Sequence, residues 1–139
     1  MTEFIARHRE TLEKALDACA RRYSWTAYPE SPSSKIHGEE KPAAGKARFE
    51  AMLGRAYPLE LPGEIGRTGA EVSPYTRQPL GITYPKVEVE TLYEAIAAGM
   101  PPWRGASPET RIGVCLEILD RCAGQLFENA HATMHTSGQ

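Results

Sequence analysis

Large aliphatic residues and long apolar runs are what this 139-residue sequence has least of. Leu, Ile, Val and Phe supply 24 residues, or about 17%, which is below the ~20% at which a chain starts to look poorly cored. Alanine supplies 18 more but buries little area. We therefore expect a thin core, marginal stability for the isolated chain and apolar helix faces that need a partner surface.

A dominant charge, a membrane span and a secretory signal are also missing. The 16 basic and 18 acidic residues leave a net charge of −2, which argues against the strongly basic face typical of nucleic-acid binding. No run of 18 apolar residues predicts a membrane span. The start, Met1–Phe4, does not resemble a signal peptide, and three cysteines do not describe a disulfide framework. The sequence predicts a cytoplasmic, reduced protein with neither nucleic acid nor membrane as partner.

The first 86 residues combine one long predicted helix with an irregular segment. Apolar residues recur at three- and four-residue spacing from Thr2 to about Arg22, which predicts a single amphipathic helix. Residues 24–86 hold eight of the eleven prolines and seven of the twelve glycines, so only a short helix, about 43–53, fits there. Residues 70–72 and 81–84 are strand candidates around a turn, which predicts a loose β-hairpin.

Three further helices are predicted in the last third. The first covers Val89–Ala98 and should end at Gly99 and the prolines Pro101 and Pro102. Ser107 is the expected cap of the second, Gly124 is its expected break or kink, and the third runs from about Gln125 to His135 before Gly138. The fold class is mainly α with one β-hairpin (α+β). We divide it into an extension, 1–71, and a hairpin with three helices, 72–139.

The three cysteines, Cys19, Cys115 and Cys122, are interpreted as small buried residues. Cys115 and Cys122 are seven residues apart on a predicted helix, so their Cα atoms lie ~10.5 Å apart, beyond the ~7 Å limit of a disulfide. No further ligands complete a metal site with them. Cysteine is among the residue types most often buried.

His131 and His135 are spaced i, i+4 on the last predicted helix, with Glu128 three residues earlier. Metals use that spacing, but no glutamate directly follows His131 and no third histidine is near. We favour a pair of partly exposed histidines near a helix C-terminus. A small metal-binding domain built on the pair stays open as an alternative.

Glycines and serines suggest no further chemistry. Gly63, Gly66 and Gly69 form a GxxGxxG pattern that lacks the preceding strand and following helix of a dinucleotide-binding motif, so we expect a turn-rich loop. No serine stands in a GxSxG turn, and the segment 35–41 is interpreted as a solvated loop. From its motifs and spacings alone, the sequence therefore assigns no catalytic, cofactor-binding or metal-ligating residue.

Several segments nevertheless form a recognisable series from Val72 onward. They are Val72-Ser73-Pro74-Tyr75-Thr76 leading to Leu80-Gly81-Ile82, the helix Val89–Ala98 followed by Met100–Arg104, the helix start Ser107–Arg111, and the exit Thr136–Gln139. This series resembles the opening of an aldehyde dehydrogenase. Tyr28–Ser33, Gly45–Gly54, Gly81–Pro85 and Arg111–Asp120 are similar to one branch of that superfamily, the phenylacetate-degradation (PaaN-type) enzymes.

The resemblance implies an N-terminal fragment of an α/β aldehyde dehydrogenase fold, in which 72–139 starts the NAD-binding domain. The family's catalytic cysteine, glutamate base, asparagine and Rossmann-like dinucleotide site all lie beyond the third helix, so none maps onto this chain. The parent reaction would oxidise a ring-opened, CoA-linked semialdehyde with NAD or NADP. The implied partner is the remainder of an aldehyde dehydrogenase chain or a homo-oligomer subunit. A stand-alone helical interaction module without enzymatic activity stays open as an alternative.

Overall fold

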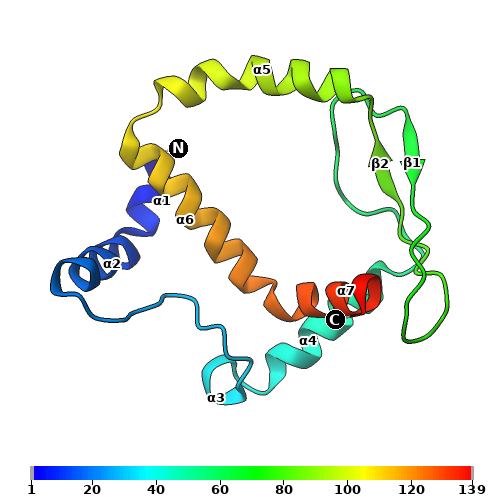
Figure 1. Ribbon diagram of the computed structural model, residues 1–139, viewed down its shortest axis with the longest axis horizontal. Helices are drawn as coiled ribbons and strands as arrows, with labels where there is room; N and C mark the ends of the chain where they lie inside the picture. The colour runs from blue at the N-terminus through cyan, green and yellow to red at the C-terminus, as the bar shows by residue number, and fades with distance from the viewer. Residues whose placement is uncertain (1, 139) are drawn as a thin grey trace. The chain divides into compact units, whose positions relative to one another are not determined.

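The computed structural model describes residues 2–138, whose contacts divide the chain into two compact units (Figure 1). The first unit combines Met1–Gly38 with Pro102–Gln125, and the second combines Glu39–Pro101 with Leu126–Gln139. Each unit therefore joins stretches that are distant in sequence. Residues 1 and 139, which belong to segments singled out in the sequence, lie outside the described residues.

The first unit is helical. Its helices are α1 (Thr2–Arg7), α2 (Arg9–Arg21), α3 (Ser34–His37) and α6 (Pro108–Gly124). Helix α1 packs against α6 (Figure 1). Ser107 caps α6 as predicted, because its hydroxyl oxygen accepts a 3.2 Å hydrogen bond from the Thr110 N–H, and Pro108 occupies the first turn.

The single N-terminal helix predicted over Thr2 to Arg22 is wrong, because the structure divides it at His8. This residue has φ −100° and ψ 15°, and its side chain is 6% exposed. The His8 ring turns toward Glu117 on α6, with Nε2 2.8 Å from Oε2. A contact with a residue 109 positions away leaves no trace in the local apolar spacing, which continues across the break.

The solvated loop predicted for 35–41 is also wrong. Ser34–His37 forms the short helix α3, whose first turn is supported by a hydrogen bond from the Lys35 N–H to the Ser33 hydroxyl. The next helix, α4, begins at Glu40 and extends to Met52, a few residues earlier than the predicted start. The cap at Ser33 initiates a helix although the segment that follows is rich in charged residues.

The second unit contains α4, the strands β1 (Gly66–Thr68) and β2 (Tyr84–Lys86), the helix α5 (Val89–Gly105) up to Pro101, and α7 (Leu126–Ser137). Helices α4 and α7 lie side by side (Figure 1). The core is small, as expected from the few large aliphatic residues. It consists of Phe49, Leu80 and Ile82, with Met52, Tyr84 and Ala132 packed around it.

The predicted hairpin exists, but its strands lie farther from the turn than expected. β1 and β2 pair antiparallel, with Gly66 opposite Lys86 and Thr68 opposite Tyr84. In the described residues, Val72 of the first predicted strand forms only an isolated bridge, to Pro79, and Thr83 of the second forms one to Ala56. The glycine-rich segment is therefore partly strand, which corrects the turn-rich loop expected for it.

Helix α5 does not end at Gly99 and Pro101 as predicted but continues to Gly105. Proline fixes φ near the helical value, but Pro101 and Pro102 each remove a backbone donor and crowd the carbonyl group four residues earlier. No described residue of α5 is buried, so water can reach the carbonyl groups that lose their partners. The final helix, α7, and the exit at Gly138, with φ +79°, agree with the prediction.

Candidate functional site

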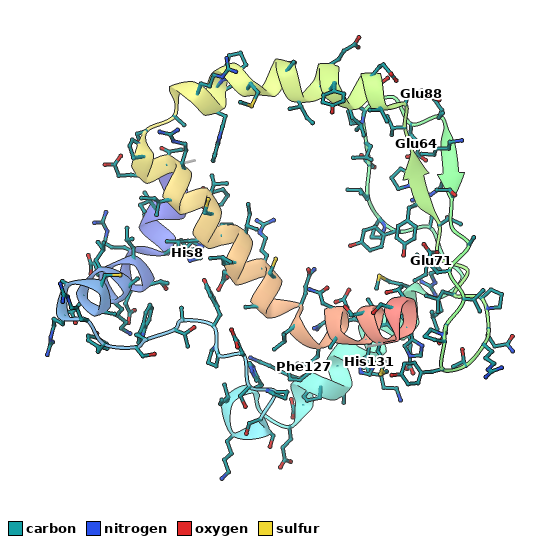
Figure 2. All side chains as sticks on the ribbon, in the orientation of Figure 1. His8, Glu64, Glu71, Glu88, Phe127 and His131 are labelled. Carbon is teal, nitrogen blue, oxygen red and sulfur yellow. The ribbon has the colours of Figure 1, made fainter. Side chains whose placement is uncertain are left out.

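A cluster of charged side chains joins α1 to α6 in the first unit. The Glu117 carboxylate, 7% exposed, accepts hydrogen bonds from Arg7 Nη1 at 2.9 Å to each oxygen, from His8 Nε2 at 2.8 Å and from Arg121 Nε at 2.9 Å. Figure 2 shows His8 where α1 meets α6. These donors, His8 first, then Arg121 and Arg7, outweigh burial and lower the pKa of Glu117 to about 2. The carboxylate therefore remains charged and fixes α1 on α6.

The face of α6 that α1 covers is not its apolar face. Thr110, Gly113 and Glu117 are buried. A Cβ atom on Gly113 would lie 2.6 Å from the backbone nitrogen of Ile5, so the glycine permits the close approach of the two helices. The residues at apolar helical spacing on α6, namely Ile112, Cys115, Leu116 and Leu119, form a stripe that lies largely on the other side, with Leu119 51% exposed.

An open groove of about 530 Å³ lies beside this stripe in the first unit. Its walls come from α2, the segment 22–28 and α6. Most lining groups are apolar or small: Thr11, Ala15, Ala18, Cys19, Arg22, Tyr23, Ser24, Trp25, Thr26, Ala27, Tyr28, Leu116 and Leu119. Burial, together with the nearby charges of Asp120 and Glu117, raises the pKa of Tyr28, so its phenol stays neutral at neutral pH. The groove suits an apolar side chain or helix face rather than an ion.

All three cysteines are exposed, so their prediction as buried residues is wrong. Cys19 lines the groove, and Cys115 and Cys122 lie on α6. The prediction placed these three side chains in a core within this chain. For Cys115 and Cys122 it fails because the face of α6 that is packed is the polar one.

The two histidines of α7 pack against an aromatic ring. The ring centroids of His131 and His135 lie 6.3 and 5.0 Å from that of Phe49, and both pairs are stacked. Both histidines are partly exposed, as expected, and Figure 2 shows His131 on α7. Glu128, the nearby carboxylate, pairs with Arg48 at 3.0 Å. Among residues 2–138 there is no group of three His, Cys, Asp or Glu side chains that could hold a metal ion.

One pair that sequence reasoning missed joins His135 to a residue 62 positions earlier. The Ser73 hydroxyl lies 2.8 Å from His135 Nδ1, and Ser73 is fully buried. A serine without accessible surface cannot attack a substrate, so the contact is structural. No local motif could have indicated this pair, because the two residues are brought together by the packing of α7 within the second unit.

The described residues do not fit a dinucleotide. Such a site needs a parallel strand, a glycine turn and a helix N-terminus that faces the phosphates, whereas β1 and β2 are antiparallel. The glycines around them serve packing within the chain. A Cβ atom on Gly63 would meet Thr91 Cγ2 at 2.6 Å, and one on Gly69 would overlap the Ile82 carbonyl oxygen.

In the part of the chain from 2 to 138, no helix is long and apolar enough to span a bilayer.

Comparison with known proteins identifies the architecture. No protein-family model matches the chain, and no curated protein matches it. A solved structure, the NAD-dependent aldehyde dehydrogenase from Burkholderia multivorans, is 42% identical over 98% of this chain, with a TM-score of 0.83. The fold is that of a fragment of an aldehyde dehydrogenase.

This chain spans 24% of the length of the Burkholderia aldehyde dehydrogenase. The match supports the aldehyde dehydrogenase superfamily that the sequence resembles. It also confirms the fold class predicted from the sequence, a mainly helical fragment with one antiparallel hairpin. The assignment to the phenylacetate branch stays a prediction.

Proposed function

We propose that this chain is the non-catalytic N-terminal part of a cytoplasmic, NAD(P)-dependent aldehyde dehydrogenase of phenylacetic acid degradation. The observation that carries the proposal is the 42% identity over 98% of the chain to an NAD-dependent aldehyde dehydrogenase about four times as long. The role of this part is then structural. It packs against the polypeptide that holds the catalytic groups.

The phenylacetate branch is supported by the sequence resemblance of four segments, two of which contribute side chains to the groove. Tyr28, from the similar segment 28–33, lines the groove, and so do Leu116 and Leu119, from the similar segment 111–120. The resemblance implies oxidation of a ring-opened, CoA-linked semialdehyde to its acid. That reaction requires a thiolate nucleophile, a base and an oxyanion site acting together. These groups belong to the rest of the proposed enzyme.

A structural role is supported by the amount of surface that the chain leaves exposed. Its accessible surface is 10200 Å². A folded protein of 15.3 kDa typically exposes about 7,100 Å², and two fully separate domains of half that mass expose about 8,600 Å² together. The surplus over the separate domains, about 1,600 Å², is about twice the ~800 Å² that each partner buries in a protein interface of standard size.

A second candidate is a stand-alone helical module that binds another protein. The apolar groove between α2 and α6 favours it, because such grooves commonly receive an amphipathic helix. The two candidates differ in the size of the natural polypeptide. In the first the groove is covered by the same enzyme, and in the second by a separate protein.

The test is to tag the gene at the start of its coding sequence in the cell that makes the protein, and to measure the mass of the tagged polypeptide. We expect a product about four times the 15.3 kDa of this chain, which oxidises aldehydes with NAD⁺ or NADP⁺. A product of about 15 kDa would overturn the proposal in favour of the separate module.

Activity of the pure 139-residue chain provides the second test. We expect no turnover of aldehydes with NAD⁺ or NADP⁺. The matched control changes Cys19, Cys115 and Cys122 to Ser together. Turnover that is lost in this variant would show that an exposed cysteine acts as nucleophile, and turnover that survives would show a different active site.

A further inference from the structure

Ser73 organises a tight turn in the second unit and uses all of its accepting capacity there. Its N–H donates to the Gln78 carbonyl at 3.0 Å, and its carbonyl accepts from the Arg77 N–H at 2.8 Å. Its hydroxyl oxygen accepts from the N–H groups of Tyr75 and Thr76, each at 3.2 Å. A hydroxyl oxygen has two lone pairs, so both are occupied and only its hydrogen remains to be placed.

The hydroxyl hydrogen has one partner, the ring of His135. Nδ1 lies 2.8 Å from the Ser73 oxygen, so the hydroxyl donates and Nδ1 accepts. His135 must then be neutral and carry its hydrogen on Nε2. A histidine protonated on both nitrogens would direct an N–H at an oxygen without a free lone pair. Ser73 is 0% exposed, so no water is available to replace the lost bond.

We propose that Ser73 and His135 form a pH-sensitive latch that fastens the end of α7 to the turn 73–78 and opens when His135 gains a proton. The latch is closed while His135 is neutral and opens as the pH falls through the range in which histidine becomes charged. Two neighbouring contacts depend on it. The Tyr75 hydroxyl donates to the Gly138 carbonyl at 3.4 Å, and the Tyr75 ring meets the His135 ring edge-on at 6.0 Å.

The groups around His135 come from α4, from α7 itself and from the turn 73–78. Helix α4 presents the uncharged ring of Phe49. On α7, His131 is one turn earlier and would add a like charge, while Glu128, two turns earlier, is paired with Arg48 of α4. The turn contributes the phenol ring of Tyr75.

The first unit offers an internal contrast. His8 places Nε2 2.8 Å from a carboxylate oxygen of Glu117, which accepts a hydrogen bond from neutral or charged histidine alike. Protonation of His8 therefore preserves its contact, whereas protonation of His135 removes one. The two histidines can be compared in the same sample.

The direct test is nuclear magnetic resonance of the ring nitrogens in the ¹⁵N-labelled 139-residue chain. At about pH 7.5 we expect His135 to be neutral, with Nδ1 unprotonated and the hydrogen on Nε2. In Ser73→Ala the hydrogen bond to Nδ1 is lost, so the ¹⁵N resonance of Nδ1 should move toward that of a histidine in water. A proton on Nδ1 of His135 at that pH in the unmodified chain would overturn the proposal without requiring any variant to fold.

Amide hydrogen exchange tests the opening. Corrected for intrinsic rates, the protection of the Tyr75 and Thr76 amides should fall at least about tenfold between about pH 7.5 and about pH 5.5. His135→Asn keeps an acceptor but does not titrate in this pH range. In that variant the protection of the Tyr75 and Thr76 amides should not change with pH. The matched control, His131→Asn, removes the other ring stacked on Phe49 and should keep the fall. An equal fall in His135→Asn, or no fall in the unmodified chain, would refute the latch. Neither result depends on the proposed enzyme.

Discussion

Replacing Gly45 by alanine should destabilise the second unit, although alanine is the better helix former. Gly45 is buried in α4 at the contact with α7. A Cβ atom there would overlap the Cβ of Phe127 and would lie 2.9 Å from both the backbone nitrogen of Glu128 and the carbonyl carbon of Phe127. Two of these atoms are backbone, so no change of rotamer can relieve the contact.

Two opposing effects set the size of the change. Alanine in place of glycine inside a helix contributes about 1 kcal/mol of stability. Overpacking a tight contact costs about 1–3 kcal/mol, and a backbone clash belongs at the upper end of that range. We therefore expect Gly45→Ala to lower the free energy of unfolding of the second unit by about 2 kcal/mol. For a domain of 60–100 residues this corresponds to about 8–16 °C in melting temperature.

The chain provides both a control and a way to separate the units. Gly99 lies within α5 of the second unit, and a Cβ atom there would meet nothing within 4 Å, so Gly99→Ala should stabilise by up to about 1 kcal/mol. Both tryptophans, Trp25 and Trp103, belong to the first unit. In urea titrations, Gly45→Ala should therefore shift the circular dichroism transition and leave the tryptophan fluorescence transition in place. Stabilisation by Gly45→Ala would refute the close crossing of α4 and α7.

Three further predictions concern the helix contacts and the core. Because the pKa of Glu117 is lowered from 4.5 to about 2, its contribution to the first unit is complete above about pH 4.5 and is lost as the pH falls toward 2. Tryptophan fluorescence should follow that loss, and Glu117→Gln should remove the acid-dependent step. Gly113→Ala should separate α1 from α6 and lower the midpoint of the fluorescence transition in urea, because its Cβ atom would press on the Ile5 backbone. Phe49→Ala, at a site 2% exposed, should cost about 3–5 kcal/mol by circular dichroism, and an unchanged midpoint would contradict its central position.

Features encoded by neighbouring residues were predictable from the sequence. Ser107 and Pro108 predict the start of α6, and Gly138 predicts the end of α7, because capping depends on residues within one turn. The helix α4 was predictable because the prolines on either side leave room for one short helix there. The hairpin was found but placed too close to its turn, since pairing Gly66 with Lys86 depends on contacts across 20 residues of chain.

Features decided by distant residues were not predictable in this way. The break at His8 depends on Glu117, and the environment of His135 depends on Ser73 and Phe49. For the candidate site, the i, i+4 spacing correctly placed His131 and His135 on one face of α7. It could not reveal that this face meets the ring of Phe49 and the buried hydroxyl of Ser73. The same i, i+4 spacing serves both for binding a metal and for stacking on a ring.

Helix α6 connects these errors to the proposed function. In a self-contained domain the apolar stripe of a helix faces the core and its polar side faces water. Here α1 covers Thr110, Gly113 and the charged Glu117, while Ile118 and Leu119 are more than half exposed. The hydrogen-bonded cluster on Glu117 makes burial of the polar side possible, since each carboxylate oxygen has donors. That arrangement leaves Ile118 and Leu119, on the apolar side, exposed. In the proposed enzyme, the surface that covers these two side chains would come from the three quarters of the aldehyde dehydrogenase length that this chain does not span.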